Sequence, residues 1–470
     1  MKKALKWIVL AVLAIIAGAA GYAVYFVSAN GAVGTGYAAK ILCSSVFLSN
    51  RDPQNVLDVD LAAVKKFQVS GKINQEGKYA TASILGLVRQ KAVYRPGLGC
   101  TILHPDTPDA LAGQPLPKTT AIPANIDSLP WPDGEMVESE LPAGVDKSKL
   151  YQALDFAFAE PDPARPIRTR AVVVVYDGRI IAERYAPGFS KDTRLQGWSM
   201  TKSVTNALVG ILVKQGKLDV HALAPVPEWA NPADPRHAIT LDNLMRMSSG
   251  LKFLEEYEKT PNSDCNLMLF VEPDAGAYAA SKPLEAQPGS KWYYSSGTAN
   301  IISRIVKQTI LAEPNHSLQD YFNFPRVELF DKLGMSSAVL EPDASGTFVG
   351  SSFMYATARD WARFGLLFYN DGVWKGERIL PEGWVKYSVT PTPHTKPDAG
   401  YGAQWWLNTG GNDRWMPGLP TDVFSACGHE GQYVTIMPSS KLVVVRLGLT
   451  VNPADWNHEA FLKKVAGAVP

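Results

Sequence analysis

Several features on which protein chemistry often depends are scarce or missing from these 470 residues. Cysteine occurs four times and never at Cys-x-x-Cys spacing, which excludes a disulfide-dense scaffold and a cysteine zinc site. None of the seven histidines forms a His-Glu-x-x-His pair, so the sequence indicates no metal site. Phosphate loops and dinucleotide fingerprints are also lacking, and we expect no cofactor. The 46 basic and 45 acidic side chains leave no basic excess for binding nucleic acid.

Hydrophobic residues, by contrast, are plentiful. They make up 46% of the chain, whereas charged residues make up 19%. Such a chain can bury a large core, so disordered and fibrous classes are excluded. The length alone predicts two to three structural units.

The N-terminus predicts a membrane anchor over residues 1–30. Three lysines in the first six residues precede an apolar run from Trp7 to Val27, and the next charge is Lys40. About 20 apolar residues can cross a bilayer, and the lysines should stay on the cytoplasmic side. We therefore expect one span in the inner membrane, with the rest of the protein outside the cytoplasm, on the periplasmic side. The alternative is a cleaved signal peptide, for which the small residues 17–20 supply a cleavage site.

Either interpretation exports the body of the protein and so permits disulfides. Cys43 and Cys100 bracket one segment, whereas Cys265 and Cys427 lie in the later part of the chain. We expect a Cys43–Cys100 bond and a second Cys265–Cys427 bond, with buried free thiols as the alternative.

Residues 31–150 form a predicted extracytoplasmic extension rich in proline. Eight prolines fall between residues 105 and 142, a density that forbids regular helix and central strand. We expect this segment to wrap the body that follows.

Regular patterning returns in residues 151–470. Apolar runs predict a strand hairpin over 171–185 around the Asp177-Gly178 turn, and two closing strands over 433–437 and 442–449. Helical periodicity lies between them, over 204–212 with Gly216 at the end, 240–247 and 298–310. The pattern predicts an α+β body, with an antiparallel sheet, flanking helices and a helical subdomain.

The sharpest chemical feature is Ser199 with Lys202, three residues apart at the start of a predicted helix. That spacing puts both side chains on one face, where an amine can take the hydroxyl proton. The positive end of the helix favours the resulting alkoxide. Tyr294, in the segment Lys291-Trp292-Tyr293-Tyr294-Ser295-Ser296, can transfer a second proton if a nearby ammonium lowers its pKa. Gly428-His429-Glu430-Gly431-Gln432 then enters a predicted strand.

These three segments, in this order, resemble the serine β-lactamase and penicillin-recognising hydrolase superfamily. The closest resemblance is to the class C β-lactamase-related esterases and the 6-aminohexanoate-dimer hydrolase group. It implies that Ser199 is the nucleophile of an acyl-enzyme, that Lys202 deprotonates it, and that Tyr294 relays protons. It also implies an oxyanion hole from the backbone N–H groups of Ser199 and Gln432. The resemblance covers roughly residues 165–460.

The remaining site residues are expected to bind substrate. The resemblance places His429 where the strand motif usually has lysine, with Gly431 beside it and Ser296 where the middle motif has asparagine. Trp405 and Trp406 are candidates to line an acyl or amide pocket, although paired aromatics often belong to a core.

Both departures from the superfamily pattern weaken the expectation of β-lactamase or peptidase activity. Ser296 cannot grip an amide as asparagine does, and a neutral His429 holds a carboxylate less firmly than lysine. We therefore expect a serine hydrolase of small carboxylic esters or linear amides, similar to 6-aminohexanoate oligomers. The alternatives are a β-lactamase or DD-peptidase acting on cell-wall-like substrates, and a non-catalytic penicillin-recognising-like binding protein.

Overall fold

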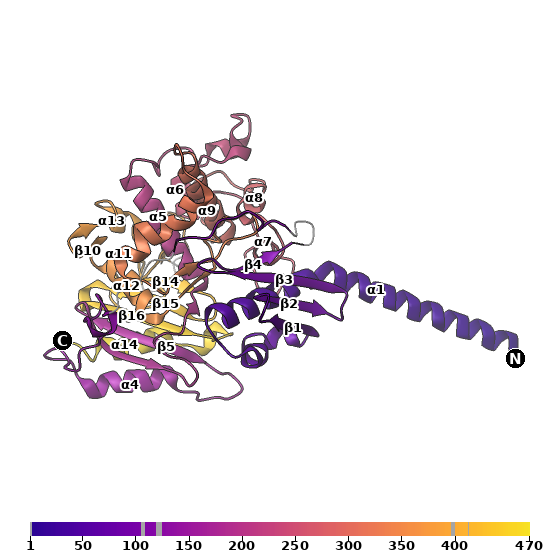
Figure 1. Cartoon of the computed structure of the whole chain (residues 1–470), viewed down its shortest axis with the longest axis horizontal. Coiled ribbons are helices and arrows are strands. Elements are labelled where there is room, and N and C mark those ends of the chain that lie inside the picture. The colour runs from indigo at the N-terminus through magenta and orange to yellow at the C-terminus, as the bar shows by residue number, and fades with distance from the viewer. Residues whose placement is uncertain (1, 105–108, 119–124, 396–399, 412) are drawn as a thin grey trace. The chain divides into compact units, whose positions relative to one another are not determined.

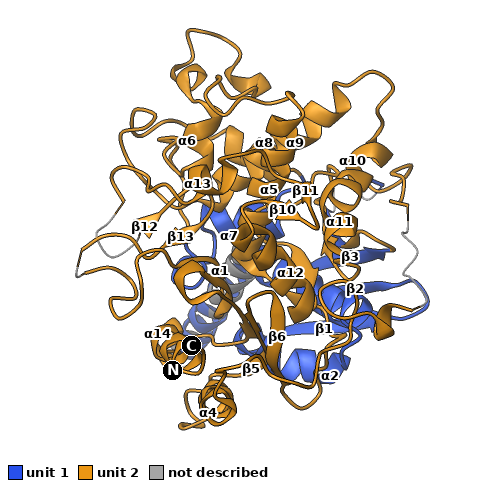
Figure 2. Cartoon of the chain, turned by 90° about the vertical axis from the view of Figure 1, so that its left-hand side faces the viewer, with its two compact units in different colours: residues 1–95, 100–110, 256–273 blue, residues 96–99, 111–255, 274–470 orange. Residues whose placement is uncertain are grey.

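The computed structural model describes the backbone of residues 2–104, 109–118, 125–395, 400–411 and 413–470. Before residue 31, it describes the side chains of residues 5–15, 17, 18 and 21 only. The chain forms two compact units (Figure 2). Unit 1 comprises residues 1–95, 100–110 and 256–273, and unit 2 comprises residues 96–99, 111–255 and 274–470. The units do not follow the predicted boundaries at residues 30 and 150, because residues 111–150 join unit 2 and residues 256–273 join unit 1.

Unit 1 is built from one long helix and an antiparallel sheet (Figure 1). Helix α1 runs from Lys2 to Cys43. The sheet has the order β1-β2-β3-β4, with strands Val69–Asn74, Tyr79–Ile84, Val88–Arg95 and Gly99–Leu103. Helix α7 (Asp264–Phe270) belongs to the segment 256–273 of unit 1. The ring of its Phe270 packs edge-on against Tyr37 of α1 at 5.3 Å. The sequence did not predict this sheet, since its strands alternate small, polar and apolar residues.

The N-terminal helix contains two apolar stretches with different surroundings. Residues 31–48 are long and apolar enough to cross a membrane, with a mean hydropathy of 1.2, but 78% of them are buried within the protein. Leu5–Ile15 is a shorter apolar stretch whose large side chains are exposed. The predicted span also includes residues 22–27, whose side chains lie outside the described part of the chain. By itself, one such helix is only weak evidence for a membrane span.

A disulfide joins Cys43, the last residue of α1, to Cys100 in β4. The buried ammonium of Lys40 donates to the carbonyl of Cys100, which ties the same two elements together. The second expected bond does not form: Cys265, on α7 of unit 1, and Cys427, on strand β14 (Phe424–Gly428) of unit 2, are both free cysteines. Both stay as thiols, and burial raises the pKa of the Cys427 thiol well above 9.

Unit 2 is organised around a seven-stranded antiparallel sheet with the order β12-β13-β14-β15-β16-β5-β6. The two strands of this sheet that come first in the sequence are β5 (Thr169–Tyr176) and β6 (Arg179–Tyr185). The remaining strands are β12 (Gly400–Tyr401), β13 (Trp406–Leu407), β14 (Phe424–Gly428), β15 (Gln432–Met437) and β16 (Leu442–Gly448). The predicted hairpin and the two predicted closing strands are therefore confirmed.

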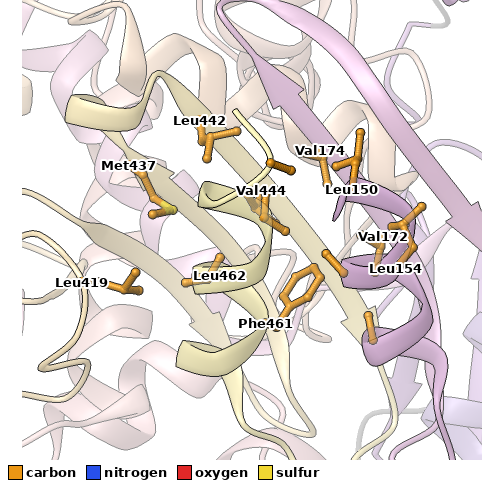
Figure 3. Close-up of a cluster of buried hydrophobic side chains, with 14 of the residues drawn as sticks. Leu150, Leu154, Val172, Val174, Leu419, Met437, Leu442, Val444, Phe461 and Leu462 are labelled. Atoms are coloured by element: carbon orange, nitrogen blue, oxygen red, sulfur yellow. The ribbon is translucent and has the colours of Figure 1, made fainter. Parts of the chain in front are cut away.

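One face of this sheet is covered by two helices, α4 (Lys147–Phe158) and α14 (His458–Ala466). Figure 3 shows Leu150 and Leu154 of α4 and Phe461 and Leu462 of α14 beside the strands. They form one buried cluster with alternate residues of the sheet, including Val172, Val174, Leu442 and Val444. Burial of each such side chain contributes about 1.5–3 kcal/mol.

Helix α12 (Ala358–Tyr369) covers the other face. It comes so close that a Cβ on Gly365 would lie 2.6 Å from Cγ1 of Val443, so this position requires glycine. Because both faces are covered, residues 171–175 of β5 are a continuous apolar run without polar alternation.

The helical part of unit 2 contains α5 (Thr201–Lys214), α6 (Leu241–Met245), α8 (Ala275–Ala280) and α9 (Ser296–Leu311). The three predicted helices correspond to α5, α6 and α9. Gly216 adopts a positive φ of 70° just past the end of α5, as its position suggested. Shorter helices are α10 (Leu318–Pro325), α11 (Asp331–Leu333) and α13 (Trp384–Ser388). The small sheet β7-β9-β8 joins Leu195–Gln196, Met354–Ala356 and Val339–Leu340.

The described part of the proline-rich segment has little regular structure, with one 3-10 turn over Ile126–Ser128. Pro105, Pro108 and Pro123 lie outside the described residues. Residues 130–136 are tied to unit 2 by buried arginines of α12. Arg363 donates to the carbonyls of Pro132 and Gly134, and Arg359 donates to Glu135. These bonds explain why the segment from residue 111 belongs to the larger unit.

Candidate active site

Ser199 lies in a 3-10 turn, Trp198–Met200, that leads directly into α5. The small sheet fixes the approach to this turn, since the N–H of Gly197 donates to the carbonyl of Met354 at 2.8 Å. Trp198 adopts a positive φ of 48°, a left-handed conformation that costs a non-glycine residue roughly 1 kcal/mol or more. The strained turn places Ser199 at the positive end of a 14-residue helix, where negative charge is favoured.

Lys202 is almost completely buried, and its polar contacts include three serine residues. Its Nζ lies 2.9 Å from Oγ of Ser199, 3.0 Å from Oγ of Ser296 and 3.1 Å from the carbonyl oxygen of Ser351. A neutral amine has two hydrogens and one lone pair. It can therefore donate to Ser296 and to Ser351 while accepting the hydroxyl proton of Ser199. The geometry suits a base directed at Ser199.

The side chain of Ser296 continues this chain of hydrogen bonds to a carboxylate. Its hydroxyl donates to Oε1 of Glu255 at 2.5 Å, and its backbone N–H donates to Oε2 at 2.7 Å. Lys202, Ser296 and Glu255 thus form one connected polar network inside unit 2. The sequence analysis missed Glu255, because it lies in a loop some 40 residues before Ser296 with no motif around it.

Tyr294 lies against the amine of Lys202, whose Nζ is 4.8 Å from the centre of the phenol ring. The expected lowering of its pKa does not occur. Burial raises the pKa of Tyr294 well above 10, and a hydrogen bond with Ser199 acts only in the opposite, weaker direction. Tyr294 is therefore a protonated phenol at neutral pH. It can donate a proton, but it cannot start the reaction as a phenolate.

Aromatic rings surround Tyr294 on its other sides. Trp406 and Tyr401 lie 5.2 Å and 5.8 Å from it, and Trp292 packs against both of them at 6.3 Å and 5.7 Å. Met247 adds an apolar side chain to this cluster. We call these five residues the aromatic cluster. Sequence reasoning had singled out only Trp406 and Tyr294 among them as site residues.

Trp405 occupies a different place from Trp406, because adjacent residues of an extended segment point to opposite sides. Trp405 is fully buried and packs against Phe364, Phe368 and Phe424 at 4.5–6.1 Å. It belongs to the core, so we leave it out of the proposed site, whereas Trp406 borders Tyr294.

The turn between β14 and β15 carries His429, Glu430 and Gly431 and contacts the nucleophile turn. The ring of His429 lies edge-on to Trp198 at 5.4 Å, and the indole N–H of Trp198 donates to Oε2 of Glu430 at 3.2 Å. A Cβ on Gly428 would lie 2.1 Å from the carbonyl oxygen of Gly197, so only glycine permits this approach.

Two buried side chains stabilise the conformation of this turn through hydrogen bonds. The guanidinium of Arg446 donates to the carbonyl of Gly431 at 2.6 Å. The amide of Gln432 donates to the carbonyls of His429 and Glu430 and exchanges bonds with Gly448. The side chain of Gln432 is thus structural, and the role of its backbone N–H as an oxyanion donor stays a prediction.

Taken together, unit 2 brings the hydroxyl of Ser199, the buried amine of Lys202, the phenol of Tyr294 and the aromatic cluster to one place. Within the described residues, no group of three or more His, Cys, Asp or Glu side chains could hold a metal ion. What the site offers is a serine nucleophile with a buried amine beside it, an arrangement suited to acyl transfer.

Comparisons with known proteins identify the family of this chain. Residues 155–467 match the sequence model of the Beta-lactamase family. The 6-aminohexanoate-dimer hydrolase of Paenarthrobacter ureafaciens is 25% identical over 309 residues, which cover 62% of this chain and 74% of that protein.

Two solved structures show the same fold. A Bacillus anthracis chain with a provisional assignment as a 6-aminohexanoate-dimer hydrolase is 21% identical, with a TM-score of 0.54 over 71% of this chain and 89% of that one. A family VIII carboxylesterase is 14% identical, with a TM-score of 0.51 over 69% and 98%. The family match spans most of the chain and includes all the residues of the site, and the expected superfamily is confirmed: this chain belongs to the Beta-lactamase family, with a β-lactamase/transpeptidase-like α+β fold.

Proposed function

We propose that this protein is a serine hydrolase that cleaves a carboxylic ester or a linear amide through an acyl-enzyme on Ser199. The observation that carries the proposal is the 2.9 Å contact between Nζ of buried Lys202 and Oγ of Ser199. A pure binding protein does not need an amine with its lone pair available to a serine hydroxyl, so the contact argues against the non-catalytic alternative.

The contacts support the following reaction. Lys202 takes the hydroxyl proton as Ser199 Oγ forms a bond to the substrate carbonyl carbon. The oxyanion is held by backbone N–H groups, of which that of Ser199 is at the helix end; one such donor is typically worth about 3–4 kcal/mol. Tyr294 passes its phenolic proton to the departing oxygen or nitrogen, and the proton on Lys202 restores the phenol. Water then attacks the acyl carbon by the reverse proton path and releases the acid.

The substrate class is inferred from what surrounds Ser199. The hydroxyl of Ser296 is already bonded to Lys202 and Glu255, so it is not available to grip the side-chain amide of a β-lactam. The carboxylate of Glu255 in the same network disfavours a substrate that brings its own carboxylate close to it. The aromatic cluster offers an apolar surface for the acyl or leaving group. The relative from Paenarthrobacter ureafaciens, which is named for a linear amide, supports the same class.

We also propose that the N-terminal helix attaches the protein to the inner membrane, with the hydrolase on the periplasmic side. Support comes from the apolar run between Trp7 and Val27, the lysines before it and the exposed apolar side chains of Leu5–Ile15. A cleaved signal peptide would leave the site unchanged but would remove this attachment.

The catalytic proposal is tested with a fluorophosphonate and a substrate panel. We expect wild-type protein and the Ser148→Ala control, a serine on exposed α4 surface, to be labelled and to hydrolyse short p-nitrophenyl esters. Ser199→Ala should lose both properties. Unchanged ester turnover by Ser199→Ala would overturn the proposal. Rapid turnover of nitrocefin, in preference to esters and linear amides, would instead favour the β-lactamase alternative.

A further inference from the structure

Three large apolar side chains stand exposed at one end of the sheet in unit 1. Phe67 is 73% exposed, Leu85 is 69% exposed and Leu87 is 53% exposed. The strand register places them together: Val69 pairs with Ile84, and Ile84 pairs with Val88. Phe67 therefore precedes β1 at the same end at which the Leu85–Leu87 turn joins β2 to β3. We call these three residues the apolar tip.

Helix α1 leaves the sheet at this same end. A Cβ on Gly31 would lie 3.2 Å from Cδ1 of Ile84, so residue 31 is beside the base of the tip. Farther along the helix, Leu42 lies against Gly71 of β1. A Cβ on Gly71 would lie 2.8 Å from Cδ2 of Leu42. The helix thus runs along the sheet from residue 42 back to residue 31, and its N-terminal part continues beyond the tip (Figure 1).

Measured along the axis of α1, the apolar tip lies at about the position where the apolar run of that helix ends. Val27 precedes Gly31 by one helical turn, which is about 6 Å along the axis. The turn residues 85–87 reach one to two residues past the Ile84–Val88 pair, which is roughly 3–7 Å. From Val27 back to Trp7 the helix rises about 30 Å, the thickness of a bilayer core. A membrane crossed by this run would have its interface at the tip.

The charges around the tip are also those of a membrane-facing surface. Residues 61–105 contain seven basic residues and one acidic residue, Glu76. Lys66 and Arg89 flank the tip, whereas Lys78 and Arg95 lie at the opposite end of the sheet and Lys65 is paired with Asp58. Lys66 adjoins Phe67, Arg89 follows Leu87 by two residues, and both are exposed. Lysine and arginine side chains near an anionic bilayer are attracted to its surface.

We propose that the apolar tip inserts into the membrane interface beside the N-terminal span, with Lys66 and Arg89 on anionic phospholipid headgroups. This inference rests on the proposed membrane attachment and adds a second contact to it. A single span leaves a protein free to tilt about its anchor. The tip fixes the sheet of unit 1 against the bilayer surface, with its Phe and Leu side chains below the headgroups and its cations among them.

The test uses the full chain reconstituted in liposomes, with a diazirine-bearing leucine analogue at one position at a time. Three positions are compared: Leu85 in the tip, Leu10 on α1 and Leu223, an exposed leucine of unit 2. After irradiation, lipid adducts are identified by mass spectrometry. We expect adducts at Leu10 and Leu85 but none at Leu223. The yield at Leu85 should rise several-fold when phosphatidylglycerol replaces part of the phosphatidylcholine, and Lys66→Glu with Arg89→Glu should abolish this rise.

The outcomes separate the two proposals. Adducts at Leu10 without adducts at Leu85 would overturn the tip contact and leave the anchor standing. Absence of adducts at both positions would overturn the anchor and the tip together. Equal labelling at Leu85 and Leu223 would show that the adducts form without specific contact, and it would also reject the inference.

Discussion

The carboxylate of Glu255 accepts two hydrogen bonds from Ser296, one from the hydroxyl at 2.5 Å and one from the backbone N–H at 2.7 Å. The first of these places an anion one hydroxyl away from the amine of Lys202. An opposite charge at this range favours the protonated form of an amine, typically by one or more pKa units. We therefore expect Glu255 to influence the proton transfer that we propose between Ser199 and Lys202.

Replacing Glu255 should change the pH dependence of hydrolysis more than it changes substrate binding. In Glu255→Gln, Lys202 loses its anionic neighbour, so the rising limb of the kcat profile should move down by about one pH unit. The amide still accepts a bond from Ser296, so KM should stay within about twofold of wild type. A pH series of steady-state ester hydrolysis measures both quantities.

Glu258→Gln is the matched control, because Glu258 is an exposed carboxylate three residues farther along the loop. Its pH profile should coincide with that of wild type. A profile of Glu255→Gln that also coincides with wild type would show that the carboxylate does not influence Lys202.

The bond between Trp198 and Glu430 should hold the nucleophile turn in its left-handed conformation. Glu430→Gln retains an acceptor at the same reach, whereas Glu430→Asn tolerates the positive φ of 61° but is one methylene too short. We expect Glu430→Asn to lower kcat roughly tenfold, which corresponds to about 1.4 kcal/mol, with little change in KM. Glu430→Gln should recover most of the rate. Equal rates in the two variants would assign Glu430 no role in positioning Ser199.

Tyr294 should matter most for substrates with poor leaving groups. Because burial raises the pKa of Tyr294 well above 10, the group acts as an acid, and an amide nitrogen needs its proton more than a p-nitrophenolate does. Tyr294→Phe should lower kcat for a linear amide on the order of 10²-fold to 10⁴-fold. The rate at which p-nitrophenyl esters acylate the Tyr294→Phe variant, measured as a pre-steady-state burst, should be much less affected. Tyr151→Phe, on the exposed side of α4, serves as the control.

Stability should fall in acid because of a buried histidine behind the sheet. His458 is bonded to Thr435 and Trp456 and stacks on Tyr433 at 3.8 Å. Burial lowers the pKa of His458 to about 3, while an unfolded histidine titrates near 6.5. The unfolded state thus binds the extra proton first. The contribution of His458 is complete above pH 6.5 and is lost as pH falls towards 3, by up to about 1.4 kcal/mol per pH unit.

Urea unfolding between pH 7 and pH 4 measures this effect. His458→Gln keeps a donor and an acceptor but cannot titrate, so its free energy of unfolding should depend less steeply on pH. The exposed His221→Gln variant should keep the wild-type slope. A wild-type slope in His458→Gln would contradict the assignment.

The Cys43–Cys100 disulfide should stabilise unit 1. It closes a loop of 57 residues, for which the chain-entropy argument gives about 4 kcal/mol. Reduction should therefore increase hydrogen exchange in strands β1 to β4. The Cys43→Ala/Cys100→Ala variant should show the same increase, and reductant should have no further effect on it. Unaltered exchange after verified reduction would show that the helix and sheet stay together without the bond.

The sequence predicted the parts of the fold in which a local pattern has a single physical solution. The hairpin around Asp177-Gly178 combines two apolar strands with a turn signal, and α5 combines helical periodicity with a terminal glycine; both are present. The pair of Ser199 and Lys202 was also predictable, since three residues is a fixed distance on a helix.

Other features depend on contacts between distant residues, which no local pattern records. The sheet of unit 1 packs against α1, which in turn packs against α7 from some 200 residues later in the chain, and its strands contain few apolar pairs. Glu255 meets Ser296 across 41 positions of sequence. The contrast between Trp405 and Trp406 depends on which side of one short segment faces the core. The basic character of residues 61–105 was hidden because the opposite charges elsewhere balance it.

The order of strands in the large sheet has a consequence for biosynthesis. Strand β5 lies between β6 and β16, so one edge of it stays unpaired until residues 442–448 have been made. At a synthesis rate of about 5–20 residues per second, β5 waits on the order of tens of seconds for this partner. During that time its run of four valines is a strand edge open to pairing with other chains. The yield of folded protein should therefore depend on how quickly the C-terminal hairpin arrives, and on any chaperone that covers β5 before then.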